Sequence, residues 1–181
     1  MNSMSNDKMT KETLSLLLDE QIRHYKTMNG ILSEVGIKPA RSPLPEYISE
    51  NIIKYAIHLI EDDSCVWDKS MPGDLNSFKQ GKIECKCFTS SGPLSFSPNP
   101  QWDVLYVLDG VEWVNSTFKL YRINLTGKSD EWSQIKVNKK DTMKMQASQG
   151  RRPRINWKAL HSQINEYTYL IWSGHISDLI R

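Results

Sequence analysis

The sequence predicts a single α/β domain in which a mixed central β-sheet is flanked by helices. Apolar side chains follow helical spacing in residues 10–60, strand patterns in residues 83–125 and helical spacing again in residues 139–164. A chain of 181 residues is long enough to bury a proper core and suits one domain. We find no internal repeat or domain boundary, so we expect residues 1–181 to form one unit.

Two helices are predicted in the first third of the chain. In residues 10–28 an apolar stripe at helical spacing comprises Leu14, Leu17, Leu18 and Ile22. Pro45 is a favourable first-turn residue, and it begins a second helix that runs to about Ile60. Two shorter helices are expected later, at residues 139–148 and 156–164.

The pattern then changes to that of strands. Residues 71–76 are typical of the entry to a strand and residues 79–81 of a turn, after which residues 83–88 alternate with period two. Residues 102–108 are almost continuously apolar, which is typical of a strand buried on both faces. Two more strands are expected, at residues 118–125 and, as an edge strand, at residues 135–137.

Composition excludes several classes of protein. Charged residues make up 24% and apolar residues 39%, as in ordinary globular proteins. No apolar stretch approaches the roughly 18 residues of a membrane span, and the polar first residues lack the apolar run of a signal peptide. The three cysteines give an odd count without a disulfide framework, so we expect a reducing cytoplasm and no membrane partner.

Charge is unevenly distributed along the chain. Residues 1–116 hold 11 Lys/Arg and 16 Asp/Glu, whereas residues 117–158 hold 11 Lys/Arg and only 3 Asp/Glu. This asymmetry favours an anionic partner for the C-terminal half, although a basic stretch is also compatible with a solvated face.

The hairpin pattern brings chemically useful side chains together. Alternation in a strand turns Glu84 and Lys86 to one face, while Ile83, Cys85 and Cys87 face the core. The turn at residues 79–81 folds the chain back and brings Asp74 beside Glu84. Paired carboxylates bind Mg²⁺, which activates a water, and an ammonium stabilises the charge that develops on a phosphate. The alternative is a surface hairpin with an ordinary Glu–Lys pair.

The context of this motif resembles a known family. Residues 72–110, from Pro72-Gly-Asp74 through Glu84-Cys85-Lys86 to Gly110, are similar to the active-site region of type II restriction endonucleases of the PD-(D/E)xK superfamily. The resemblance implies a Mg²⁺-dependent, site-specific endonuclease in which Asp74 and Glu84 bind the metal and Lys86 is the catalytic lysine. It also implies that Glu50 adds a helix carboxylate to the metal site. Gly73 stands where the motif usually has proline.

Two other segments are candidates for DNA binding. The loop from Thr89 to Pro98, with its hydroxyls at Ser91 and Ser95, suits phosphate contacts, or it is a plain surface loop. The segment 146–154 suits base reading, because arginine pairs with guanine in the major groove, or it is a solvated basic loop. The candidate base-reading residues are Arg151, Arg152 and Arg154, and the candidate phosphate-contacting residues are Lys139 and Lys140.

The sequence thus predicts an enzyme that cuts double-stranded DNA at a short specific sequence. Cutting both strands at a symmetric sequence implies a homodimer. Two alternatives remain open: a DNA repair or junction-resolving nuclease of the same superfamily, and a non-catalytic DNA-binding protein with a nuclease-like core.

Overall fold

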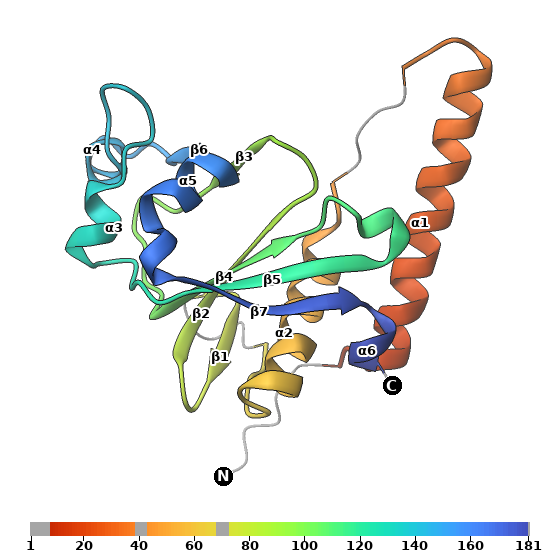
Figure 1. Cartoon of the computed structure of the whole chain (residues 1–181), viewed down its shortest axis with the longest axis horizontal. Helices are drawn as coiled ribbons and strands as arrows, with labels where there is room; N and C mark the ends of the chain where they lie inside the picture. Colours follow the sequence, from red (N-terminus) through yellow and green to blue (C-terminus); the bar gives the residue numbers. More distant parts are fainter. Residues whose placement is uncertain (1–7, 39–42, 68–72, 181) are drawn as a thin grey trace.

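The protein has a mixed five-stranded sheet covered on both faces, which confirms the predicted fold class. The computed structural model describes residues 8–38, 43–67 and 73–180. The sheet has the order β1-β2-β4-β5-β7, and only β2 and β4 are parallel (Figure 1). These strands are β1 (Leu75–Ser77), β2 (Gly81–Phe88), β4 (Val104–Asp109), β5 (Thr117–Ile123) and β7 (Thr168–His175). A separate two-stranded ribbon pairs β3 (Pro93–Ser95) with β6 (Arg154–Asn156).

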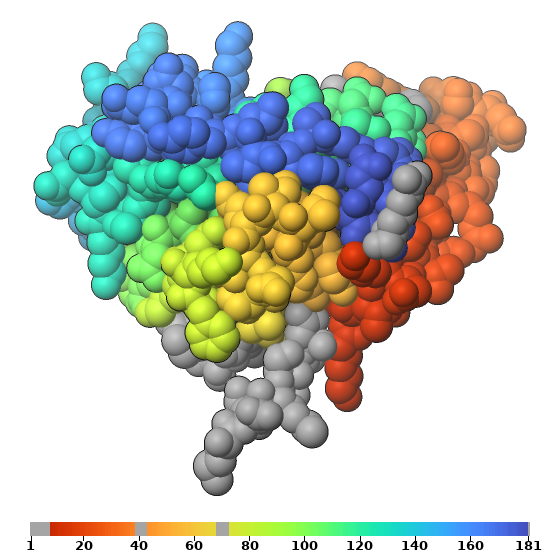
Figure 2. All heavy atoms as spheres, turned by 60° about the horizontal axis from the view of Figure 1, so that its bottom comes forward, coloured from red at the N-terminus to blue at the C-terminus, as the bar shows by residue number. Residues whose placement is uncertain are grey.

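One face of the sheet packs against the two N-terminal helices. These are α1 (Lys11–Glu34) and α2 (Glu46–Ile60). The short C-terminal helix α6 (Ser177–Ile180) packs against both of them. In Figure 2 the gold surface of α2 lies between the hairpin of β1 and β2 and the C-terminal strand. The start of α2 after Pro45 agrees with the prediction. No helix in the described part of the chain is long and apolar enough to cross a membrane.

Helix α1 is longer than predicted, because Gly36 and not Gly30 ends it. Gly30 sits within the helix, where a glycine costs only about 1 kcal/mol relative to alanine. Gly36 has a φ of 71°, and the amide of Ile37 donates to the carbonyl of Leu32 at 2.8 Å. A left-handed residue with such a back-bond is a frequent helix terminus.

The opposite face carries a second core built by the C-terminal half. Its helices are α3 (Asp130–Gln134), α4 (Met143–Ser148) and α5 (Trp157–Ile164), and they gather with the ribbon at one end of the sheet (Figure 1). Two single 3₁₀ turns complete the fold, at Trp113–Asn115 and Asn165–Tyr167. Strand β4 serves both cores: Tyr106 and Leu108 face the N-terminal helices, and Leu105 and Val107 face the second core. This confirms the prediction of a strand buried on both sides.

The predicted edge strand at residues 135–137 is wrong. Only an isolated bridge from Lys136 to Thr142 forms there. The side chain of Gln163 accepts from the amide of Lys136 at 2.8 Å and donates to its carbonyl at 3.0 Å, so these backbone groups are satisfied without a strand partner. The helix expected at residues 139–148 begins only at Met143, because Thr142 caps it by accepting from the amide of Met145.

Candidate active site

A hairpin at the end of the sheet brings Asp74 to Glu84, as the sequence predicts. Leu75 pairs with Ile83 in the antiparallel ladder of β1 and β2. The amide of Asp74 donates to the carbonyl of Ile83 at 2.9 Å, and its Oδ2 accepts from the amide of Cys85 at 2.7 Å. The backbone of β2 therefore fixes one oxygen of Asp74 and leaves the other available to a ligand.

The conformation of Gly73 explains why this motif begins with Gly-Asp. Its φ is 104°, and a Cβ at this position would lie 3.0 Å from the carbonyl oxygen of Ile83. Proline fixes φ near −65°, so it could not adopt this backbone. Pro72 lies outside the described residues.

Glu84 and Lys86 form an ion pair on one face of β2. The Nζ of Lys86 is 2.6 Å from Oε1 of Glu84, and the two side chains are only 20% and 15% exposed, respectively. The Lys86 ammonium also lies 5.8 Å from the centre of the Phe96 ring. Burial alone would lower the pKa of Lys86, but the Glu84 carboxylate outweighs it and the pKa is raised. Lys86 is therefore a stable cation at neutral pH.

The other face of β2 belongs to the core. Ile83 and Cys85 are buried among the residues that pack on α1 and α2, with Cys87 partly buried beside them. All three cysteines, Cys65, Cys85 and Cys87, are free thiols. Burial and the nearby carboxylate of Asp74 raise the pKa of Cys85 well above its usual value, so the thiol stays neutral. The predicted facing of the strand is confirmed.

Glu50 belongs electrostatically to the same site. It lies on α2, which contacts β2, and its pKa is raised to about 7. Burial is the main cause, followed by repulsion from Asp74 and Glu46, while Lys86 and a hydrogen bond from Trp67 act in the opposite direction. The pKa of Asp74 is also raised, by burial and by the charge of Glu84. Glu50 and Glu84 thus both interact electrostatically with Asp74 and with Lys86.

The site opens to solvent beside the end of the loop from Thr89 to Pro98 and the residues that follow it. A hollow of about 340 Å³ is lined by Gly73, Glu84, Ser97, Asn99, Pro100, Gln101 and Trp102. Trp102 is buried and Asp103 accepts from the amide of Lys82 at 2.9 Å, so both residues hold this loop in place. Among residues 8–38, 43–67 and 73–180, no three His, Cys, Asp or Glu side chains lie close enough together to hold a metal ion.

The two predicted DNA-binding segments lie side by side. Ser95 on β3 pairs in register with Arg154 on β6, and the amide of Phe96 donates to the carbonyl of Pro153 at 3.0 Å. The inner face of this ribbon is buried through Leu94 and Ile155. Ser91 is exposed in the loop that leads into β3. Nothing in the sequence patterns indicates this long-range pairing.

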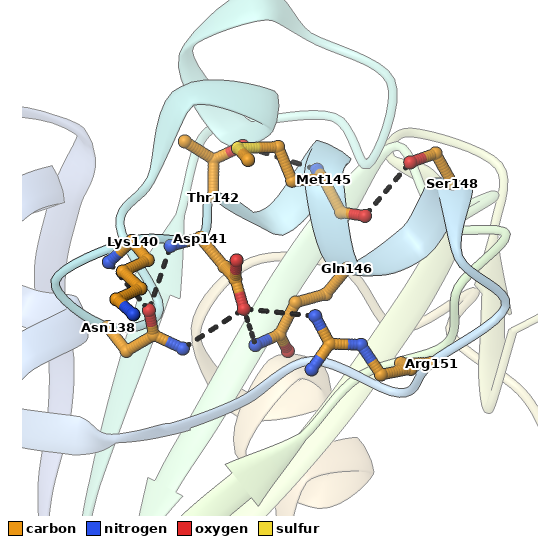
Figure 3. Close-up of polar contacts among 8 residues, drawn as sticks. All are labelled: Asn138, Lys140, Asp141, Thr142, Met145, Gln146, Ser148 and Arg151. Atoms are coloured by element: carbon orange, nitrogen blue, oxygen red, sulfur yellow. Dashed lines mark hydrogen bonds and ion pairs between the residues drawn. The ribbon is translucent and has the colours of Figure 1, made fainter.

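The basic side chains differ in their partners. Lys139, Lys140, Arg152 and Arg154 are exposed and form no ion pair with any residue in the described ranges. Arg151, in contrast, is paired with Asp141 at 2.9 Å (Figure 3). No sequence pattern indicates this pairing.

Sequence reasoning also missed a polar network on the sheet. Glu61 accepts from the hydroxyl of Tyr106 and pairs with Arg122, and the side chain of Gln80 donates to it at 3.1 Å. Burial and the Glu61 carboxylate raise the pKa of Tyr106. This network gives the buried Tyr106 hydroxyl its partners and links Gln80 of the hairpin to Glu61 at the end of α2.

A mixed sheet flanked by helices, with this cluster of carboxylates and a lysine at one end, is consistent with a restriction-endonuclease-like fold. The model of the Bsp6I restriction endonuclease family matches residues 11–166, and the chain belongs to this family. This confirms the resemblance to a type II restriction endonuclease. Searches of curated proteins and of solved structures found no match.

Proposed function

We propose that this restriction endonuclease cuts duplex DNA at a short specific sequence, with Mg²⁺, through Asp74, Glu84 and Lys86. The observation that supports the proposal best is Asp74, fixed by the backbone of β2, beside the ion pair of Glu84 and Lys86. We further propose that residues 1–181 form one nuclease domain of the PD-(D/E)xK superfamily.

The side chains present fit a hard divalent cation. All the candidate ligands are carboxylates. Burial and, after it, repulsion from neighbouring carboxylates raise the pKa values of Asp74 and Glu50, and a bound cation would offset both effects. Mg²⁺ is usually bound by one or two carboxylates and keeps several waters, which suits a site where no three such ligands gather among the described residues. Asp74 and Glu84 would hold the ion, and Glu50 is the additional candidate. A bound Mg²⁺ would lower the pKa of a water and offset charge on the phosphate.

The residues of the chain divide the remaining work. Lys86 is proposed to act as a cation, because its ammonium is paired with the Glu84 carboxylate at 2.6 Å. An ammonium held by Glu84 and packed near Phe96 has little freedom, which favours stabilising charge at a fixed position. Asp74 is oriented by the amide of Cys85 and needs no reorganisation before it binds a ligand.

DNA is proposed to contact the ribbon and the basic segments beside it. A two-stranded ribbon fits the major groove of B-DNA. Its outer face carries Ser95 and Arg154, and Arg152 precedes it. The other proposed contacts are Ser91, Lys139, Lys140 and Arg151. Because one active site cuts one strand, we propose a homodimer for cleavage of both strands.

Digestion of plasmid DNA tests this function. We expect discrete fragments with Mg²⁺ from the wild type and none from a folded Lys86→Ala variant under the same conditions. Nicking confined to DNA junctions would instead indicate a repair or junction-resolving nuclease. A gel shift without any cutting would indicate a non-catalytic DNA-binding protein.

A further inference from the structure

Asp141 joins two basic segments that are separate in the sequence. Its Oδ2 accepts from Asn138 Nδ2 at 3.2 Å, from Gln146 Nε2 at 3.2 Å and from Arg151 Nη2 at 2.9 Å (Figure 3). The Asp141 side chain is only 20% exposed, against 50% for Arg151. These hydrogen bonds from Gln146, Arg151 and Asn138 lower the pKa of Asp141, so it is ionised at neutral pH.

The turn that carries Lys139 and Lys140 is closed by hydrogen bonds from its backbone amides. Oδ1 of Asn138 accepts from the amides of Lys140 and Asp141, each at 2.8 Å. The amide of Val137 donates to the carbonyl of Asp141 at 2.9 Å. The carboxylate of Asp141 therefore projects from a fixed turn, with Lys139 and Lys140 at its tip.

The segment from Arg151 to Arg154 is held at Arg151, whose side chain pairs with the same Asp141 carboxylate. The amide of Arg151 donates to the carbonyl of Gln146 at 3.0 Å, and the Gln146 side chain is buried beneath it. Three residues later Arg154 enters β6, opposite Ser95 of β3. Arg151 is thus held three residues before Arg154, at the approach to the ribbon.

Pairing with Asp141 also distinguishes the three arginines. The charge of Arg151 is offset by a carboxylate at 2.9 Å, whereas Arg152 and Arg154 are exposed and have no ion pair among the described residues. A guanidinium already held by a carboxylate has fewer donors free for a base or a phosphate. Arg151 therefore keeps fewer donors for its contact with DNA and is suited chiefly to anchor the segment, whereas its two neighbours keep all of theirs.

We propose that Asp141 is a positioning residue for sequence recognition: it holds Arg151 as an anchor and so presents Arg152 and Arg154 to the DNA. This inference rests on the proposed function, because it needs a protein that recognises a specific sequence. The acidic side chain does not touch the DNA, and its like charge would repel phosphates if Arg151 did not offset it.

Binding of Asp141→Asn to the specific and to a random duplex, in Ca²⁺ and across a salt series, tests the proposal. We expect affinity for the specific duplex to fall roughly 10- to 100-fold, the loss of a hydrogen bond to a charged group. Affinity for the random duplex should stay the same or rise, because Arg151 is released toward phosphate and a negative charge is lost. Glu131→Gln is the matched control: it removes an equally charged, exposed carboxylate from the neighbouring α3 and should not reduce specificity.

A second variant and a DNA-free measurement complete the test. Arg151→Gln should reproduce the loss of specificity, and the double variant should lose no more than either single variant, since both remove one interaction. Without DNA, trypsin should cut after Arg151 faster in Asp141→Asn than in Glu131→Gln. Equal losses on both duplexes, unchanged specificity or equal trypsin rates would each overturn the positioning role. If the wild type itself bound both duplexes equally, the proposed function would be overturned as well. That result concerns the wild type and is therefore distinct from the three outcomes for the variants.

Discussion

Neighbouring residues of β2 should have separable effects on activity and on stability. Lys86→Ala removes the cation beside Glu84, and the loss of one charge-stabilising group costs roughly 100- to 1,000-fold in rate. Cys85→Ser replaces a thiol that is only 6% exposed with a hydroxyl, and we expect it to cost about 1–2 kcal/mol of unfolding free energy. For a chain of this size that corresponds to a fall in Tm of about 2–8 °C. The amide of Cys85 that orients Asp74 is unchanged, so this variant should keep most of its activity.

The assay combines plasmid cleavage with thermal unfolding of the same preparations. Cys87→Ser is the matched control, because Cys87 is only partly buried and contacts the Ser49 hydroxyl, so the new hydroxyl keeps a partner and stability should fall less. If Cys85→Ser were inactive although fully folded, and Lys86→Ala remained active, the assignment of one face of β2 to catalysis and the other to the core would be refuted.

Three further predictions concern the metal, the DNA and acid stability. EDTA should abolish cleavage, and Ca²⁺ should support binding without turnover in a gel-shift assay; undiminished cutting in EDTA would rule out the metal mechanism. Lys139→Ala should weaken binding to all sequences and reduce the slope of log affinity against log salt concentration by about one unit. Arg154→Ala should instead cost about 1–3 kcal/mol of binding free energy on the specific duplex alone. Equal losses from Arg154→Ala on both duplexes would show that Arg154 contacts phosphate. Although burial alone would raise the pKa of Asp62, hydrogen bonds from Ser64 and Ser77 hold it below its usual 3.8. Asp62→Asn should therefore cost about 1–3 kcal/mol at neutral pH, and this difference should shrink as pH falls below 3.8. Urea unfolding at several pH values measures it, and a constant difference would contradict the assignment.

Local patterns were sufficient for the parts of the fold that depend on near neighbours. Period-two alternation in residues 83–88 assigned Glu84 and Lys86 to one face and Cys85 to the other, because successive side chains of a strand must alternate. The turn before Gly81 predicted that Asp74 would return to β2, and the ladder of β1 and β2 has that register. The helices at the N-terminal side were predicted for the same reason, since helical spacing is local.

Local patterns failed where a distant group competes for the backbone. Residues 135–137 have strand-like composition, yet Gln163 takes the hydrogen bonds of Lys136 and no ladder forms. Strand β7 was not predicted, because at the edge of the sheet it is largely exposed and its side chains lack a clear alternation. Its partner β5 precedes it by about 50 residues, and no short window of sequence contains both strands.

The order of residues along the chain places two carboxylates and a lysine on one hairpin and gives the C-terminal half its basic charge. Which of these groups lie near one another depends on contacts between distant elements. Glu50 approaches Asp74 because α2 packs on β2, Ser95 meets Arg154 through the pairing of β3 with β6, and Arg151 is held by Asp141. The physical reason is that periodicity fixes the direction of a side chain relative to its own element, whereas contacts between elements depend on how the whole chain packs.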